Sequence, residues 1–335
     1  MFSDRYNNFL KNLSEFKTEY INGNIVKKEF YQYELLSSIL NYYENQFNEK
    51  EIDRLRSKYN SLFIFLPSNI PVEFIQFMLL IFSYDFKVFY KLPSRDNGFI
   101  KKFFDILKDE KIKAGFLEHK DSIKTAKNYD FIIGSGSVKL ENVLKSLLKP
   151  YRFFGPKFSF AILKENSRRD MNNIIGDFLS FDTEGCLSTR YLFTFEDPDF
   201  INIKNSIEKL KLIYYPQKTF NRETFHYYNE INLYYSKRYI LNKSEAVFEV
   251  DEIPEFFPQR TLFIKKIKKY EDIIKFLGDS IRSVQSITTK NGEKLEYFEK
   301  NSSVSIFLPY GKSQFPPINW SFEKGLNINN FFENK

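Results

Sequence analysis

Short apolar runs alternate along the chain with stretches whose apolar residues recur at helical spacing. The first run, SLFIFL (61–66), ends before Pro67 and is typical of a buried strand. The other elements expected up to residue 148 are a helix over about 72–83, the strand FKVFY (86–90), a helix over about 97–109, a strand near KAGFL, the strand YDFIIG (129–134) and the helix SVKLENVLKSLL (137–148). This strand–helix alternation predicts a parallel sheet covered on both faces.

The two ends of the chain extend this pattern. Residues 1–57 are polar with apolar positions at helical spacing, which predicts helices. The elements expected after residue 150 are the strand FSFAIL (158–163), the helix RRDMNNIIGDFLSF (168–181), the strand STRYLFTF (188–195), a strand and helix in TLFIKKIKKYEDIIKF (261–276), the strand SSVSIFLP (302–309) and an irregular tail rich in proline and aromatic residues. We therefore expect an α/β protein in three parts, over residues 1–153, 154–310 and 311–335.

Composition and charge narrow the functional classes. The formal net charge is +7, but lysines are interleaved with 43 acidic residues and no zinc spacing or RNP-like motif accompanies them, so we expect no nucleic-acid partner. A single cysteine excludes a disulfide framework and indicates a reducing compartment. The N-terminus has no long apolar region of a secretory signal. The best membrane candidate, residues 72–90, is too short and too charged to span. These features predict a cytoplasmic protein without a membrane span.

The only cysteine, Cys186, lies in FDTEGCLSTRYLF (181–193), between a helical stretch and a strand. A nearby helix terminus or hydrogen-bond donor would lower the pKa of its thiol and make it a nucleophile. A single cysteine also fits a small buried hydrophobe. The local sequence leaves both interpretations open.

Two loops follow expected strands of the first part, at the edge where open parallel sheets bind ligands. In PSNIP (67–71) two prolines fix the turn around Asn69, whose carboxamide suits an oxyanion hole or a simple Asx-turn. In VFYKLPSRDN the side chains of Lys91, Ser94 and Arg95 suit a ribose or phosphate, or a solvated turn.

A third loop at this edge is GSGS (134–137). Ser135, Gly136 and Ser137 would let backbone N–H groups approach a phosphate, although a flexible turn fits equally well. The full GxGxxG fingerprint of dinucleotide-binding proteins is absent, since Lys139 stands where its last glycine would fall.

Taken together, these elements resemble the aldehyde dehydrogenase superfamily. Within it they are most similar to the acyl-CoA reductase family, typified by the reductase subunit of bacterial bioluminescence fatty-acid reductases. The resemblance runs from about residue 60 to 322. The matching residues are Pro67, Asn69 and Pro71 of a Pro-x-Asn-x-Pro loop, Lys91, Pro93 and Ser94 of a Lys-Pro-Ser-like element, Ser135, Gly136 and Ser137 of a Thr-Gly-Ser-like turn, Gly185 and Cys186 of the cysteine element, and Pro316, Pro317 and Trp320 of the ending.

The resemblance implies a Rossmann-type cofactor domain over 1–153 and a catalytic α/β domain over 154–310. It implies reduction of acyl-CoA to an aldehyde through an acyl-enzyme, with Cys186 as nucleophile and Asn69 as oxyanion donor. The cofactor-binding residues it implies are Lys91, Ser94, Arg95, Ser135, Gly136, Ser137 and Glu255. We expect NADPH rather than NADH, because the loop after Lys91 offers Ser94 and Arg95 before any carboxylate.

Departures from the family pattern leave alternatives open. Phe153 stands where hydrolytic members carry a water-activating glutamate, and the element around Glu255 lacks its glycine. A non-catalytic or acyl-carrier subunit of the same fold is one alternative, and a phosphate-ester reductase of the superfamily is another. The acyl donor is either free acyl-CoA or an acyl group delivered by a partner synthetase, and a homo- or hetero-oligomer is possible.

Overall fold

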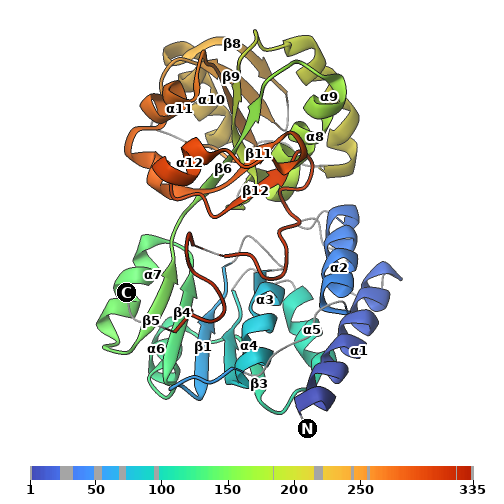
Figure 1. The fold of residues 1–335 in the computed structure, drawn as a ribbon, viewed down its shortest axis with the longest axis vertical. Helices are drawn as coiled ribbons and strands as arrows, with labels where there is room; N and C mark the ends of the chain where they lie inside the picture. The colour runs from blue at the N-terminus through green and yellow to red at the C-terminus, as the bar shows by residue number, and fades with distance from the viewer. Residues whose placement is uncertain are drawn as a thin grey trace. The chain divides into compact units, whose positions relative to one another are not determined.

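The computed structural model describes residues 2–22, 33–48, 55–67, 73–93, 98–183, 185–214, 222–242, 245–254, 257–321 and 323–332. The chain forms two compact units (Figure 1). Unit 1 comprises Met1–Pro156, Pro317–Asn319 and Leu326–Lys335, and unit 2 comprises Lys157–Pro316 and Trp320–Gly325. Residues 311–335, which the sequence sets apart as a tail, are therefore divided between the two units.

Unit 1 contains a fully parallel sheet in the order β3-β2-β1-β4-β5. Its strands are β1 (Ser61–Phe65), β2 (Lys87–Lys91), β3 (Ile112–Gly115), β4 (Phe131–Ser135) and β5 (Tyr151–Phe154). Its helices are α1 (Phe2–Ile21), α2 (Tyr33–Asn48), α3 (Glu73–Gln76), α4 (Met78–Tyr84), α5 (Phe99–Leu107), α6 (His119–Ala126) and α7 (Val138–Ser146). The predicted alternation is confirmed. The helix expected over about 72–83 is broken at Phe77, and α6 and β5 were not predicted.

Helices cover both faces of the unit 1 sheet, as Figure 1 shows. The α6–α7 face buries a cluster of Phe63, Phe65, Ala126, Ile132, Leu144 and Leu147. On the opposite face the ring of Tyr90 lies 4.7 Å from that of Phe104 in α5, which in turn lies 5.5 Å from that of Phe74 in α3, centroid to centroid. Successive side chains of a strand point to opposite faces, so one apolar run supplies both clusters.

The N-terminal helices complete the core of unit 1. Phe9 of α1 is fully buried, and its ring lies 4.9 Å from that of Phe47 and 4.8 Å from that of Phe82. Arg5 donates from Nη1 to Asp85 at 2.7 Å across the rim of this contact. The role of α1 and α2 is therefore packing, and α1 lies beside both α2 and α5 (Figure 1).

The last described residues of the chain are an apolar anchor for unit 1. Phe332 is 8% exposed, and its ring lies 5.0–5.8 Å from four aromatic rings, those of Tyr59, Tyr84, Phe86 and Phe131. The hydroxyl of Tyr84 also donates to the carbonyl of Ile328 at 2.6 Å. A segment distant in sequence from the sheet is thereby part of its core.

The described part of unit 2 contains a mixed sheet in the order β12-β11-β6-β7-β10-β9-β8, in which the pair β8–β9 is antiparallel and the other pairs are parallel. Its strands are β6 (Phe158–Leu163), β7 (Thr189–Thr194), β8 (Ser236–Leu241), β9 (Ala246–Val250), β10 (Thr261–Lys266), β11 (Val284–Thr289) and β12 (Ile306–Pro309). Its helices are α8 (Arg168–Leu179), η1 (Ser180–Thr183), α9 (Phe200–Tyr214), α10 (Arg222–Tyr234), α11 (Tyr270–Leu277), η2 (Gly278–Ser283), η3 (Lys290–Gly292) and α12 (Glu296–Asn301).

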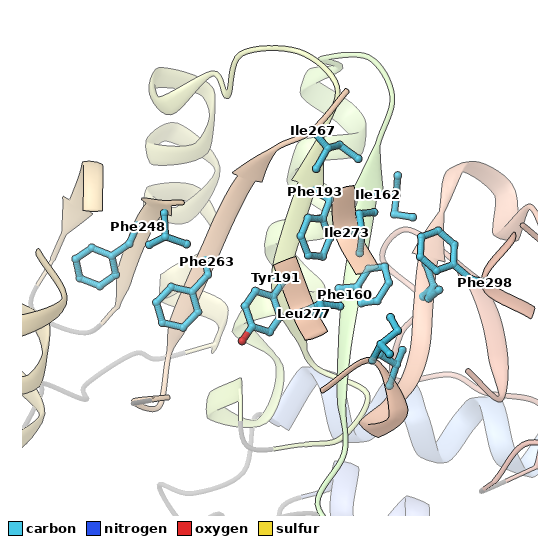
Figure 2. Packing of buried hydrophobic residues seen from close by; sticks show 14 of the residues in the cluster. Phe160, Ile162, Tyr191, Phe193, Phe248, Phe263, Ile267, Ile273, Leu277 and Phe298 are labelled. Carbon is cyan, nitrogen blue, oxygen red and sulfur yellow. The ribbon is translucent and has the colours of Figure 1, made fainter. Parts of the chain in front are cut away.

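The strand residues of unit 2 alternate between two buried clusters. Phe160, Ile162, Tyr191, Phe193 and Phe263 face the helices α10–α12, as Figure 2 shows. The residues between them face α8 and α9, and include Ala161, Leu163, Leu192, Leu262 and Ile264. The elements singled out in the sequence of this unit are confirmed, except that SSVSIFLP (302–309) is a strand only over Ile306–Pro309. Strands β8, β9 and β11 and helices α9, α10 and α12 were not singled out. Among the described residues no helix has both the length and the apolar character needed to cross a membrane.

We predict that Phe332→Ala lowers the free energy of unfolding of unit 1 by about 3–5 kcal/mol, the usual cost of removing a buried phenylalanine ring. Urea denaturation followed by tyrosine fluorescence measures the change. Phe116→Ala is the matched control, because Phe116 is 50% exposed in the same unit, and it should change the value by less than about 0.5 kcal/mol. Equal effects of the two substitutions would contradict the anchoring role.

Candidate active site

Cys186 lies on a tight turn that leads from η1 into β7. The backbone N–H of Ser188 donates to the carbonyl of Gly185 at 3.0 Å, which closes the turn. Gly185, Leu187 and Ser188 are buried, whereas Cys186 is partly exposed. The turn therefore presents one side chain to solvent, and that side chain is the only thiol of the chain.

Buried side chains hold the backbone of this Cys186 turn. Ser159 of β6 donates from Oγ to the carbonyl of Cys186 at 2.7 Å. Ser188 donates from Oγ to the carbonyl of Ser180 at 2.8 Å, and it accepts from Nε2 of Gln314 at 3.3 Å. Contacts from a neighbouring strand, from η1 and from the C-terminal segment thus fix the turn on three sides.

The backbone just before the turn is strained. Phe181 and Thr183 have φ values of 49° and 61°, in the left-handed region that non-glycine residues rarely occupy. Thr183 is held there by two hydrogen bonds, one from its Oγ1 to the carbonyl of Phe178 and one from Nε of Arg190 to its own carbonyl, both at 3.2 Å. Such conformations cost about 1–3 kcal/mol each and persist only where surrounding contacts impose them.

Asp177 of α8 is a buried carboxylate that holds the C-terminal segment beside this turn. It accepts from the backbone N–H of Gly311 at 2.7 Å and from that of Ser313 at 3.0 Å. Burial raises its pKa to about 7, and the opposing effects of Ser313, Gly311 and the charge of Lys312 do not cancel the cost of burial. Asp177 therefore changes charge near neutral pH.

We predict that this titration is visible in the stability of the protein. The pKa of Asp177 is about 7 in the folded chain and near its ordinary 3.8 in the unfolded chain. Between these values the folded state keeps a proton that the unfolded state has lost. The resulting contribution is complete below pH 3.8 and disappears as the pH rises through 7.

Because other carboxylates titrate as well, the measured quantity is the difference in unfolding free energy between wild type and Asp177→Asn at several pH values. This difference should fall by about 1.4 kcal/mol per pH unit from pH 4.5 to 7 and level off above pH 8. A difference that stays flat from pH 5 to 7 and falls only as the pH drops below about 4 would show that the two backbone donors outweigh the burial.

In unit 1, two of the expected anion-binding elements lie at the same edge of the sheet. Strand β1 separates β2 from β4, and the register aligns Lys91 with Phe65 and Phe65 with Gly134. Adjacent strands are about 4.8 Å apart, so the ends of β2 and β4 are about 10 Å apart. Lys91 is partly buried there, and burial lowers the pKa of its ammonium group.

The turn after β4 leads directly into a helix N-terminus. Gly136 donates its backbone N–H to the carbonyl of Phe154 at 3.1 Å, and Ser137 is the N-cap of α7 with no capping bond from its hydroxyl. A Cβ on Gly134 would lie 2.7 Å from Cδ1 of Leu144, so a larger residue here would force the buried Leu144 side chain to shift. A helix N-terminus, hydroxyls and a nearby ammonium group together fit an anionic phosphate.

The remaining predicted site residues, Asn69, Ser94, Arg95 and Glu255, lie outside the described residues. The structure adds four residues that the sequence did not single out, namely Ser159, Asp177, Ser286 and Gln314. The signal available for Ser159, Asp177 and Ser286 was a polar residue within an otherwise apolar strand or helix face, which in a buried element requires a hydrogen-bonding partner.

The chain has an α/β fold of the aldehyde dehydrogenase class, in which a Rossmann-type domain is joined to a second α/β domain. Aldehyde dehydrogenase 21 from Physcomitrella patens, solved with the reaction product succinate, is 10% identical with a TM-score of 0.74 over 99% of this chain and 84% of that chain. The glyceraldehyde-3-phosphate dehydrogenase GapN from Methanocaldococcus jannaschii, solved with NADP, is 14% identical with a TM-score of 0.67 over 98% and 85%. No family model and no curated protein matches the sequence.

Proposed function

We propose that the chain is an NADPH-dependent reductase that converts an acyl thioester, acyl-CoA, to an aldehyde through an acyl group carried on Cys186. The observation that carries this proposal is the Cys186 turn, in which Cys186 is partly exposed while Gly185, Leu187 and Ser188 are buried and the backbone is held by hydrogen bonds. Structural cysteines are among the most buried residue types, so this exposure favours a reactive role.

In the proposed reaction the thiolate of Cys186 attacks the thioester carbonyl carbon. A bond forms between this carbon and the cysteine sulfur, the bond to the CoA sulfur breaks, and CoA leaves as a thiolate that takes up a proton. The carboxamide of Asn69 and the backbone N–H of Cys186 are the proposed donors to the oxyanion. NADPH, when bound, supplies the hydride that brings the acyl carbon to the aldehyde level. The bond between this carbon and the cysteine sulfur then breaks, which releases the aldehyde and restores the Cys186 thiolate. Acyl-CoA, NADPH and one proton thus give an aldehyde, CoA and NADP⁺.

The residues proposed to hold NADPH are those suited to its phosphates. Lys91 supplies a positive charge at the end of β2, and Ser135, Gly136 and Ser137 form the turn before the N-terminus of α7. A phosphate near Lys91 would favour its protonated form and offset the cost of burial. Ser94, Arg95 and Glu255 join this set on the evidence of the sequence pattern alone.

The identity of Phe153, which stands where hydrolytic members of the resembled superfamily carry a glutamate, supports acyl transfer to a thiol rather than to water. In β5 the side chain of Phe153 packs against the cluster of Phe63 and Leu144. An apolar ring at this position cannot act as a general base. The proposal therefore includes no residue that activates water at this position. The acyl group arrives either on free acyl-CoA or from a partner synthetase. The attack of Cys186 on the carbonyl carbon is the same in both cases.

We predict that Cys186→Ala abolishes both aldehyde formation and covalent acyl labelling while the far-UV circular dichroism stays unchanged, because the substitution removes only one sulfur atom. The assay incubates the protein with acyl-CoAs of several chain lengths and NADPH, following NADPH absorbance, aldehyde and, by mass spectrometry, acyl adducts. Turnover retained by the alanine variant would rule out covalent catalysis by Cys186. Acyl labelling of the wild type without any reduction would identify an acyl-carrier subunit instead.

We also predict that kcat/KM is about tenfold or more higher with NADPH than with NADH, since charged hydrogen bonds to a 2′-phosphate contribute about 1.5–3 kcal/mol. Arg95→Glu should shift the ratio toward NADH by repelling that phosphate. Lys87→Gln is the matched control, because Lys87 is an exposed lysine at the other end of β2 and should leave the ratio unchanged. A wild type that uses NADH equally well would overturn this interpretation of the loop.

A further inference from the structure

Ser159 is the point at which three strands of unit 2 meet the Cys186 turn. Its side chain is fully buried and donates to the carbonyl of Cys186 at 2.7 Å. Behind it lies Ser286 of β11, also fully buried, with the two Oγ atoms 2.6 Å apart. The backbone N–H of Ser286 donates to Oγ of Ser159 at 3.1 Å.

The direction of these hydrogen bonds follows from counting protons. A hydroxyl carries one hydrogen, and that of Ser159 goes to the Cys186 carbonyl, which can only accept. Between the two hydroxyls, Ser286 must therefore be the donor. Oγ of Ser159 gives one hydrogen bond and receives two, so its bonding capacity is filled. Both hydrogen bonds that Oγ of Ser159 accepts come from Ser286. Ser286 thereby orients the hydroxyl of Ser159 toward the carbonyl of Cys186.

The backbone pattern explains why hydroxyls occupy this place. The register of β6 with β7 shifts between Ser159 and Phe160, and that of β11 with β6 shifts between Val284 and Ser286. A shifted register interrupts the ladder and leaves backbone groups that need other partners. Ser159 supplies those partners by accepting from the N–H of Ser286 and donating to the carbonyl of Cys186.

We propose that Ser159 is a positioning residue for Cys186, with Ser286 orienting its hydroxyl. This inference rests on the proposed role of Cys186 as nucleophile. Fixing the Cys186 carbonyl fixes the peptide plane that follows it, and together with the bond from Ser188 to Gly185 it holds the residue from both sides. The direction in which the thiol projects is set in this way, and a displacement of about 1 Å is enough to slow an oriented reaction about 100-fold.

The test compares an oriented reaction with an unoriented one. Ser159→Ala should lower the single-turnover rate of acylation by acyl-CoA by about 10- to 100-fold. Its rate of alkylation by iodoacetamide, a small reagent without a defined approach, should stay within about threefold of the wild type. Ser286→Ala should lower acylation less, by about two- to tenfold, the size of one weakened hydrogen bond.

The double substitution provides the sharpest comparison. Because Ser286 acts on Cys186 only through Ser159, the double variant should be no slower than Ser159→Ala, within about twofold. Ser206→Ala is the control for lost stability: Ser206 is 2% exposed and its hydroxyl bonds within α9 to the carbonyl of Asn202 at 2.8 Å. It should leave acylation unchanged.

A second readout does not depend on the reaction. The only thiol can be labelled with bromotrifluoroacetone, and the ¹⁹F spectrum should change from one narrow signal in the wild type to a broadened or split signal in Ser159→Ala. If Cys186→Ala proves active and the proposed function fails, the ¹⁹F spectrum still tests whether Ser159 holds the Cys186 turn in place. Acylation by Ser159→Ala within threefold of the wild type, an equal loss in Ser206→Ala, or an unchanged ¹⁹F spectrum would overturn the inference. Should Ser159→Ala fail to fold, Ser286→Ala takes its place, and a loss of acylation below twofold or an unchanged ¹⁹F spectrum in that variant would overturn the inference.

Discussion

Both sheets bury both of their faces, and the rest of the structure depends on this constraint. A strand that is buried on two sides is usually apolar at successive positions. Among the described residues, a helix joins each pair of successive parallel strands within a sheet except β9 and β10. Phe160 and Ala161 are neighbours in sequence but belong to different clusters on opposite faces of the sheet. The crossovers in turn collect all strand ends of one polarity at one edge, where side chains from distant parts of the sequence come together.

Strand polarity separates the candidate residues into two kinds. In unit 1, Lys91 is the last residue of β2, and the turn at Gly136 lies between the carboxyl end of β4 and the N-terminus of α7, where anions are favoured. In unit 2, Cys186 precedes β7, and Ser159 and Ser286 lie in the first half of their strands. There the ladder registers shift, and buried hydroxyls replace part of the backbone pairing. The residues proposed to bind phosphate are therefore placed by strand ends and a helix N-terminus, whereas the thiol is placed by buried hydroxyl contacts.

The pattern of apolar residues predicted the strands that are buried on both faces and are therefore apolar at nearly every position. Strands β1, β4, β6, β7 and β10 carry near-continuous apolar runs and were all expected. Strand β11 (VQSITT) was not expected, because polar residues interrupt its apolar positions. The break between α3 and α4 at Phe77 was not expected either, because no proline or glycine marks it. The contact of Ser159 with Ser286 joins residues 127 positions apart, and only the strand order brings them together. Cys186 itself was identifiable because it is unique in the chain.

The C-terminal segment illustrates how one stretch of chain is held by two kinds of force. Gly311 and Ser313 are held in unit 2 by the buried carboxylate of Asp177, a directional contact whose strength depends on ionisation. Phe332 is held in unit 1 by four aromatic rings, a contact that depends on burial and not on pH. Directional bonds suit the end beside the Cys186 turn, where orientation matters. Apolar burial suits the other end, where the segment needs only to stay attached.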